Sequence, residues 1–365
     1  MGLVPERLRD IRLFNGYTLE MVAEKIGVTK QAVSKYEAGK TIPATDTLLK
    51  ILDLYGIKQD YLTNQRNLLS DHSIVFYRTV KTTTAKRKEV AEVYLKWFSE
   101  IITVIDGMYP MRKPDLPQIS PDLSISEKAE LLRKYWNLGE DVVDDMVSLL
   151  EKHGFGLFSV EWEDEKIDGF SQMIDSRPII VINEKRGTKQ RRQFSVAHEL
   201  GHLILHRNVK EITDVEEKEA DEFAGCFLMP ERRIQADLVR NSADFFVELS
   251  GKWRVSPQAL VERCRNLGLL GRNEEENEAR RHNLYQKLNR KVTEEDSDVV
   301  CSVRAALEFI EANAESAERF HKELRLPVKE LQRLFKPVKG LVWYDQFDYK
   351  EDINDIEGTQ MSFLF

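Results

Sequence analysis

Apolar residues recur at helical spacing through the first 64 positions of the chain. One stripe repeats at intervals of three and four residues: Leu19, Val22, Ala23 and Ile26. Such a stripe predicts an amphipathic helix that buries one face. Gly27 suits a tight turn, and Thr29 is a favourable N-cap for a second helix in which Val33 and Tyr36 face inward. The pattern predicts a small bundle built around two short helices and a turn.

The pattern changes after residue 126, where helical and strand-like segments are mixed. The stretch SEKAELLRKYWNLGEDVVDDMVSLLEKHG predicts two amphipathic helices separated near Gly139. Two alternating segments, GLFSVEW and IDGFSQMI, predict strands, and Ile179 to Ile182 form the apolar centre of a third, buried strand. Further helices follow. We expect a small sheet that leads into a helical region, which is an α+β arrangement.

The chain has 365 residues, a length that favours two or three domains. We predict a helix-turn-helix bundle over 1–64, a helical linker over 65–125, an α+β domain over 126–272 and a charged helical region with an irregular tail over 273–365. The linker carries a break marked by four prolines: Pro110, Pro114, Pro117 and Pro121. The predicted fold class is therefore multidomain, an all-α bundle followed by an α+β domain with a small sheet and a mostly helical C-terminal region.

Composition and charge narrow the function classes. A formal net charge of −8 argues against a protein that coats nucleic acid without specificity, although a local basic surface can still bind DNA. The three cysteines, Cys226, Cys264 and Cys301, are too widely spaced for a thiolate metal cluster and suit a reducing compartment. The first residues do not resemble a secretory signal, and no apolar stretch is long enough to span a bilayer. We expect a cytoplasmic protein without a membrane partner.

The segment QFSVAHELGHLILHR contains the pattern H-E-x-x-H at His198, Glu199 and His202. Two histidines four positions apart lie on the same face of a helix, so both imidazoles can bind one metal ion. Glu199 lies beside the first ligand, where its carboxylate can take a proton from water at the ion. The motif predicts a catalytic metal site.

The third protein ligand must come from elsewhere. His206 continues the same row, but along a straight helix it lies about 12 Å from His198, too far for all three histidines to share an ion, and we interpret it as a helix-end or surface residue. The helix predicted for EEKEADEFAGCFLMP offers Glu217, with Asp221 four positions later as a hydrogen-bond partner for a ligand imidazole. Two further acidic residues of this helix, Glu216 and Glu219, are alternative ligands that we expect to be solvated.

The second helix of the N-terminal bundle directs polar side chains outward. The candidate DNA contacts are Thr29, Lys30, Gln31, Ser34, Lys35 and Lys40. Such side chains can reach base edges and phosphates of double-stranded DNA from the major groove. Because sequence-specific proteins of this kind commonly read two half-sites, the pattern is compatible with a homodimer. The alternative is a bundle that binds proteins rather than DNA.

Three segments together, RRQFSVAHELGHLILH, EKEADEFAGCFLMP and VSPQALVERCRNLGLL, resemble the ImmA/IrrE family of zinc metallopeptidases. The resemblance implies a gluzincin-like site with His198, His202 and Glu217 as ligands of zinc, with manganese as the alternative ion, and Glu199 as the catalytic base. The family often has Asn where this chain has Asp221. Members act on helix-turn-helix repressors, so the resemblance implies an endopeptidase that cleaves a repressor and releases stress, phage or mobile-element genes.

Residues 1–64 resemble the Cro/C1 (XRE-type) helix-turn-helix domain, including the Glu37-Ala38-Gly39 ending. This resemblance implies an operator as the DNA partner. Two other functions remain open. The peptidase fold can serve sensing or protein interaction in a transcription factor or antitoxin-like regulator, without proteolysis. Alternatively, the protein can cleave its own linker within residues 64–125.

Overall fold

The structure is a computed structural model that describes residues 2–64, 76–79, 85–160, 167–174, 176–183, 188–207, 209, 212–288 and 302–335. Five helices form the N-terminal bundle: α1 (Pro5–Phe14), α2 (Leu19–Ile26), α3 (Lys30–Glu37), α4 (Thr45–Tyr55) and α5 (Gln59–Thr63). The Thr29 side chain accepts a hydrogen bond from the backbone N–H of Ala32 and so caps α3. The predicted pair of helices and the turn at Gly27 between them are confirmed.

A four-stranded sheet lies at the centre of the chain. Its strands are β1 (Phe76–Thr79), β2 (Gly156–Val160), β3 (Ile167–Ile174) and β4 (Arg177–Asn183), in the spatial order β1-β3-β4-β2. β3 is antiparallel to both β1 and β4, whereas β2 is parallel to β4. The sequence predicted β2, β3 and β4. It did not predict β1, which comes from the linker.

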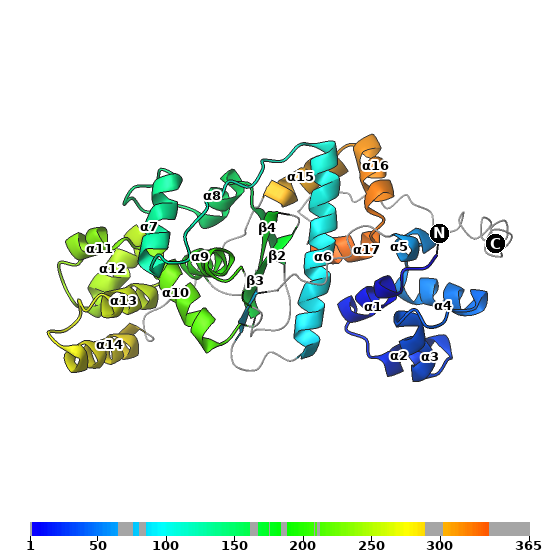
Figure 1. Cartoon of the computed structure of the whole chain (residues 1–365), viewed down its shortest axis with the longest axis horizontal. Helices are drawn as coiled ribbons and strands as arrows, with labels where there is room; N and C mark the ends of the chain where they lie inside the picture. Colours follow the sequence, from blue (N-terminus) through cyan, green and yellow to red (C-terminus); the bar gives the residue numbers. More distant parts are fainter. Residues whose placement is uncertain are drawn as a thin grey trace.

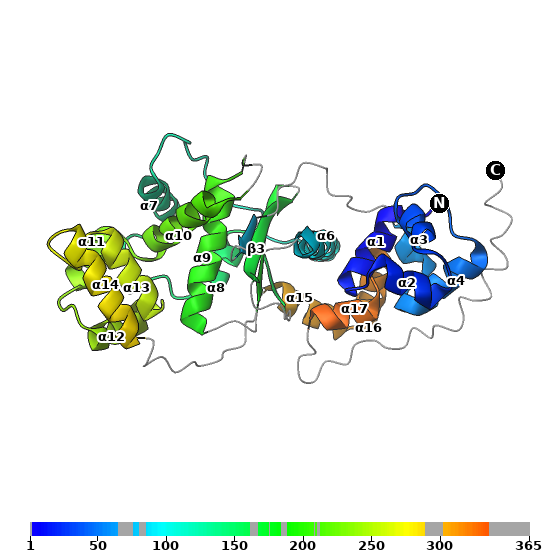
Figure 2. The ribbon, with the colours of Figure 1, turned by 90° about the horizontal axis from the view of Figure 1, so that it is seen from below.

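A long helix, α6 (Ala85–Met108), separates the sheet from the N-terminal bundle (Figures 1 and 2). Its Phe98 ring stacks on Phe158 of β2 at a centroid distance of 3.9 Å. Its Trp97 packs against Phe14 of α1 at 4.3 Å. One apolar core therefore runs from the helix-turn-helix bundle through α6 to one face of the sheet.

The other face of the sheet is covered by α9 (Lys189–Leu205), which packs against α10 (Asp214–Leu228) (Figure 2). A second apolar core gathers these helices with those before and after them: α7 (Ile125–Tyr135), α8 (Met146–Lys152), α11 (Glu231–Asp237), α12 (Ala243–Trp253), α13 (Pro257–Asn266) and α14 (Glu274–Leu288). Because apolar layers cover both faces of the sheet, nearly every residue of β2 and β4 is buried. Cys226 belongs to this core, and burial raises the pKa of its thiol.

The C-terminal helices return to the N-terminal bundle. They are α15 (Ser302–Glu311), α16 (Ala314–Leu324) and α17 (Val328–Leu334). The Asn64 side-chain amide donates to the backbone oxygen of Leu324 at 3.2 Å, and that of Asn15 donates to Glu330 at 3.2 Å. An irregular tail was predicted at the end of the region 273–365, and residues 336–365 lie outside the described residues.

The predicted fold class is confirmed, with an all-α helix-turn-helix bundle, an α+β domain around a small sheet and further helices toward the C-terminus. Within the described part of the chain, none of the helices combines the length and the apolar character that crossing a membrane requires. The boundaries between the four segments remain predictions.

Candidate metal centre

The candidate ligands His198 and His202 lie on the inner face of α9. The side chain of Thr188 caps the start of this helix by accepting a hydrogen bond from the backbone N–H of Arg191. His198, Glu199 and His202 all have 0% of their surface exposed. Three ionisable residues on one turn of a buried helix are costly unless they are paired or bind a metal, so their burial indicates a functional site.

The helix α10 supplies the acidic residues. It begins with a capping box in which the Thr213 hydroxyl binds backbone N–H groups of the first turn and the Glu216 carboxylate accepts from the Thr213 backbone N–H at 2.8 Å. The hydrogen bond from the Thr213 hydroxyl is the main reason why the pKa of Glu216 is lowered. Glu216, one of the two alternative ligands, is thus engaged in starting the helix.

Two small residues allow α9 and α10 to approach closely. Gly201 lies between the two histidines in sequence, and Ala220 lies between Glu217 and Asp221. A Cβ atom at Gly201 would lie 3.1 Å from the Ala220 backbone oxygen and 3.2 Å from its Cα, which is tighter than ordinary contact. The glycine of the H-E-L-G-H segment therefore lets α10 bring its carboxylates to the imidazoles.

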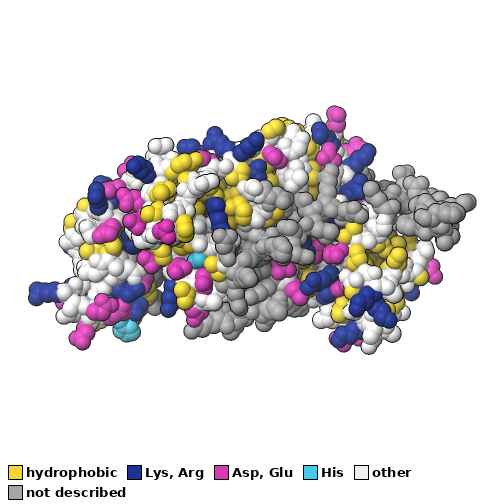
Figure 3. Space-filling model, viewed as in Figure 1, with side chains coloured by type: hydrophobic (Ala, Val, Ile, Leu, Met, Phe, Trp, Pro, Cys, Tyr) yellow, Lys and Arg dark blue, Asp and Glu magenta, His cyan; other side chains and the backbone are white. Residues whose placement is uncertain are grey.

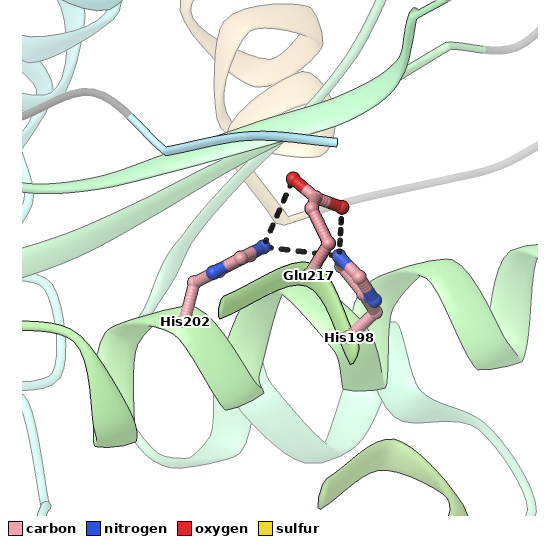
Figure 4. A group of neighbouring side chains, drawn as sticks. All are labelled: His198, His202 and Glu217. Carbon is pink, nitrogen blue, oxygen red and sulfur yellow. Dashed lines mark hydrogen bonds and ion pairs between the residues drawn. The ribbon is translucent and has the colours of Figure 1, made fainter. Parts of the chain in front are cut away.

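Three side chains converge between the two helices. The Nε2 atoms of His198 and His202 are 3.0 Å apart, and the Glu217 carboxylate lies 3.4 Å from the first and 3.8 Å from the second. Figure 4 shows the carboxylate of Glu217 directed toward both imidazoles. One ligand atom from each residue falls within a group no more than 4.8 Å across. The structure thus brings together the three residues that the sequence predicted as ligands.

The geometry of this group fits a metal ion. Ligand atoms held about 2.0–2.1 Å from a tetrahedral zinc ion stand roughly 3.3 Å apart, close to the spacings of His198, His202 and Glu217 given above. Two imidazole Nε2 atoms and a carboxylate also form a donor set that zinc favours.

Two further contacts orient the residues of the motif. The Asp221 carboxylate lies 2.7 Å from Nδ1 of His198, as expected for a carboxylate that holds a ligand imidazole. Ser171 of β3 is fully buried, and its hydroxyl donates to the Glu199 carboxylate at 2.7 Å. Sequence reasoning did not identify Ser171, because nothing in an alternating strand distinguishes one inward serine from another.

Of the two interpretations of His206 from sequence, a helix-end residue is confirmed and a surface residue is wrong. It does end α9, but only 2% of its surface is exposed. Its Nδ1 lies 2.9 Å from Nδ1 of His202, and its Nε2 lies 2.9 Å from the carboxylate of Glu219. Glu219, which we expected to be solvated, is therefore paired with a buried imidazole. A signal was present in sequence, since His206 lies four residues after His202 on the same helix face.

The linker strand β1 runs beside this site. Its backbone is antiparallel to β3, with Phe76 opposite Ser171 and Tyr77 opposite Phe170. The register shifts between Tyr77 and Thr79. β1 also contacts α9, and Figure 4 shows it as the light-blue strand next to the three candidate ligands.

The candidate DNA contacts lie on and just beside α3, at the end of the bundle opposite α6 (Figure 2). All of them are exposed: Thr29, Lys30, Gln31, Ser34, Lys35 and Lys40. The Lys30 ammonium forms an ion pair with Glu20 of α2 at 2.7 Å. On the face drawn in Figure 3, Lys and Arg side chains of the bundle alternate with acidic and apolar ones. The surface is therefore only locally basic, in agreement with the nine Lys or Arg and eight Asp or Glu of residues 1–64.

Two segments of the chain match known protein families. Residues 150–265 match the IrrE N-terminal-like domain of a peptidase family, and residues 8–62 match a helix-turn-helix family. The first match contains β2, β3, β4, α9 and α10, and the second contains α2 and α3. Both resemblances inferred from sequence motifs are confirmed for these segments.

The curated relatives that the chain resembles are helix-turn-helix regulators, each matched over a limited part of this chain. The chain is 42% identical over 57 residues to the HTH-type transcriptional regulator ImmR of Bacillus subtilis, a match that covers 16% of this chain and 45% of the relative. It is 39% identical over 57 residues to the prophage-derived regulator YonR of the same organism, covering 16% of this chain and 53% of the relative. The matched segment spans about half the length of these relatives. A longer match, 29% identical over 114 residues, covers 30% of this chain and 97% of the B. subtilis regulator YqaE.

Proposed function

We propose that this protein is a DNA-binding transcriptional regulator with a metal-dependent endopeptidase site that cleaves a helix-turn-helix repressor. The observation that carries the proposal is the group of His198, His202 and Glu217, with Glu199 on the same helix turn and Ser171 bound to its carboxylate. The match of residues 150–265 to a peptidase family supports it. The likeness of residues 8–62 to helix-turn-helix regulators supports the DNA-binding part.

The chemistry follows from the roles of individual side chains. His198, His202 and Glu217 would hold the metal, zinc in the first instance and manganese as the alternative. When bound, zinc supplies Lewis acidity that polarises a carbonyl and lowers the pKa of water toward 7. Glu199 accepts the proton of the attacking water and returns it to the leaving amine. The Ser171 hydroxyl donates to the Glu199 carboxylate at 2.7 Å and so orients it.

A second candidate function is cleavage of this chain by itself. β1 is an extended segment aligned along β3, directly opposite the serine that binds Glu199. Addition of an extended peptide to the edge of a sheet is a common way to bind peptide substrates. Cleavage within residues 76–79 would break the covalent connection between the N-terminal bundle and the rest of the chain.

One experiment tests both candidates. The purified full-length protein, loaded with zinc, is incubated with a purified helix-turn-helix repressor from the same organism, and the products are analysed by mass spectrometry. We expect two repressor fragments, which do not form when a chelator has removed the metal. Fragments of the protein itself ending within 76–79 would support self-cleavage instead. An intact repressor and an intact protein in the metal-loaded sample would reject both.

The DNA-binding part of the proposal predicts the effect of changes on α3. Gln31→Ala should weaken binding to the preferred operator about 5- to 150-fold, because a side-chain contact to a base edge is worth about 1–3 kcal/mol. Lys35→Ala should weaken binding to all sequences and lower the slope of log affinity against log salt by about 1. Fluorescence anisotropy with an operator selected from random duplexes measures both.

Lys134→Ala is the matched control, since Lys134 is exposed on α7, far from the helix-turn-helix bundle in sequence. It should bind DNA as the wild type does. If Gln31→Ala and Lys35→Ala also bind as the wild type does, these side chains are not DNA contacts. A wild-type protein that selects no operator would indicate a bundle that binds proteins instead.

A further inference from the structure

His206 and Glu219 extend the candidate metal site by two residues. His206 lies at the C-terminal end of α9 and is buried, whereas the side chain of Glu219 on α10 is 43% exposed. The imidazole of His206 connects Glu219 to the site. Its Nδ1 lies 2.9 Å from Nδ1 of His202, and its Nε2 lies 2.9 Å from the Glu219 carboxylate. These residues therefore form a continuous chain from a ligand to the protein surface.

Only one arrangement of hydrogens suits this chain when His202 binds a metal. A ligand imidazole is neutral and uses the lone pair of Nε2, so its proton is on Nδ1. Nδ1 of His202 then donates to Nδ1 of His206, which must accept. The proton of His206 is therefore on Nε2, where it donates to the Glu219 carboxylate. Each polar atom of the chain is satisfied in this arrangement.

We propose that His206 and Glu219 are positioning residues that hold His202 in the ring orientation and tautomer required to bind the metal. The inference rests on the proposed metal site. It adds two residues that do not contact the ion and act through a ligand.

The two ligand histidines are then held in different ways. His198 contacts the carboxylate of Asp221 directly, at 2.7 Å, whereas His202 reaches the carboxylate of Glu219 through the ring of His206. Both carboxylates and the ligand Glu217 come from α10. One helix thus supplies a ligand and the partners that orient the other two ligands. The spacing of Glu217, Glu219 and Asp221 on that helix is therefore functional.

If His206 and Glu219 only stabilised the fold, changes at Glu219 would affect the stability of the protein rather than its metal affinity. Since 43% of the Glu219 side chain is exposed, solvent screens its pairing with His206, and the pair contributes little to the free energy of unfolding. Loss of a partner that orients a metal ligand commonly lowers metal affinity about 10- to 100-fold. Metal affinity should therefore respond to changes at Glu219, while the melting temperature of the metal-free protein should not.

The test compares zinc dissociation constants of full-length variants, measured by competition with a chromogenic chelator. We expect affinity to fall about 10- to 100-fold in both Glu219→Ala and His206→Ala. His206→Gln should recover part of the loss, because its amide oxygen can still accept from Nδ1 of His202. Visible spectra of the cobalt-substituted variants should shift as the geometry at His202 changes.

Glu222→Gln is the matched control, since Glu222 is an exposed carboxylate three residues further along α10. It should bind zinc as the wild type does. Wild-type affinity in Glu219→Ala would overturn the inference, as would an equal loss in Glu222→Gln, which would indicate a general effect of charge. A wild-type protein that binds no zinc would instead reject the proposed function itself, so the two failures are distinguishable.

Discussion

Glu199→Gln should slow cleavage of the repressor by about 10²–10⁴-fold, the contribution that a positioned general base usually makes. Glutamine has nearly the same shape as glutamate and can still accept the hydrogen bond from Ser171 through its amide oxygen. It cannot take a proton from water. His198, His202 and Glu217 are unchanged, so zinc content should remain that of the wild type. Operator binding depends on the N-terminal bundle and should also remain.

The measurement is kcat/KM for repressor cleavage, with zinc content and operator affinity determined on the same preparations. Glu222→Gln serves as the control, because it makes the same chemical change at an exposed position of α10. If Glu199→Gln cleaves the repressor within a few-fold of the wild type, Glu199 is not the base. If the variant regulates its genes normally in cells, regulation does not depend on proteolysis, and the peptidase fold serves sensing or interaction.

Glu100→Ala should lower the free energy of unfolding by about 3–5 kcal/mol, which is the usual cost of removing one partner from a buried ion pair. Arg7 of α1 and Glu100 of α6 are only 3% and 1% exposed, and their side chains meet at 2.7 Å. Burial disfavours the charge on Arg7, but the attraction and hydrogen bond of Glu100, together with the electrostatic effects of Tyr61 and Asp10, outweigh it and raise the pKa of Arg7. Without Glu100 this buried guanidinium would lose its paired carboxylate and keep a hydrogen bond to the backbone oxygen of Asn64.

Urea unfolding followed by circular dichroism measures this effect. The double variant Arg7→Met with Glu100→Leu is the informative comparison, since replacing both partners of a buried pair by apolar residues is often nearly neutral. We expect it to recover most of the lost stability. A loss below about 1 kcal/mol in Glu100→Ala would show that water reaches Arg7 and that the bundle does not depend on this pair for its position.

The ion pair also bears on how the two functional parts are connected. α6 contacts the helix-turn-helix bundle through Arg7 and Phe14 and the sheet through Phe158. Separate sequence patterns predicted the bundle and the sheet but not their common core. Arg7 and Glu100 are 93 positions apart, and each is a charged residue of the kind usually found on a helix surface.

The sequence alone determined the part of the site that lies on one helix. The spacing of His198, Glu199 and His202 is set by helix geometry, so knowledge of the fold was not needed to place them together. The same geometry argued against His206 as a third ligand, and the group of converging side chains consists of His198, His202 and Glu217. Helix caps at Thr29 and the helical stripe of the N-terminal bundle were likewise predictable, because capping and amphipathic spacing depend on neighbouring residues.

Only the tertiary structure decided what depends on contacts between distant segments. Helix spacing favoured Glu217 but left Glu216 and Glu219 as alternatives. In the structure α9 and α10 approach closely at Gly201 and Ala220, and the Glu217 carboxylate lies next to the imidazoles. β1 is four residues long, and its pairing with a strand about 95 positions away defines it. Ser171 likewise meets Glu199, and His206 meets Glu219, only because separate elements pack together. Local spacing specifies which side chains share a helix face, whereas packing specifies what that face meets.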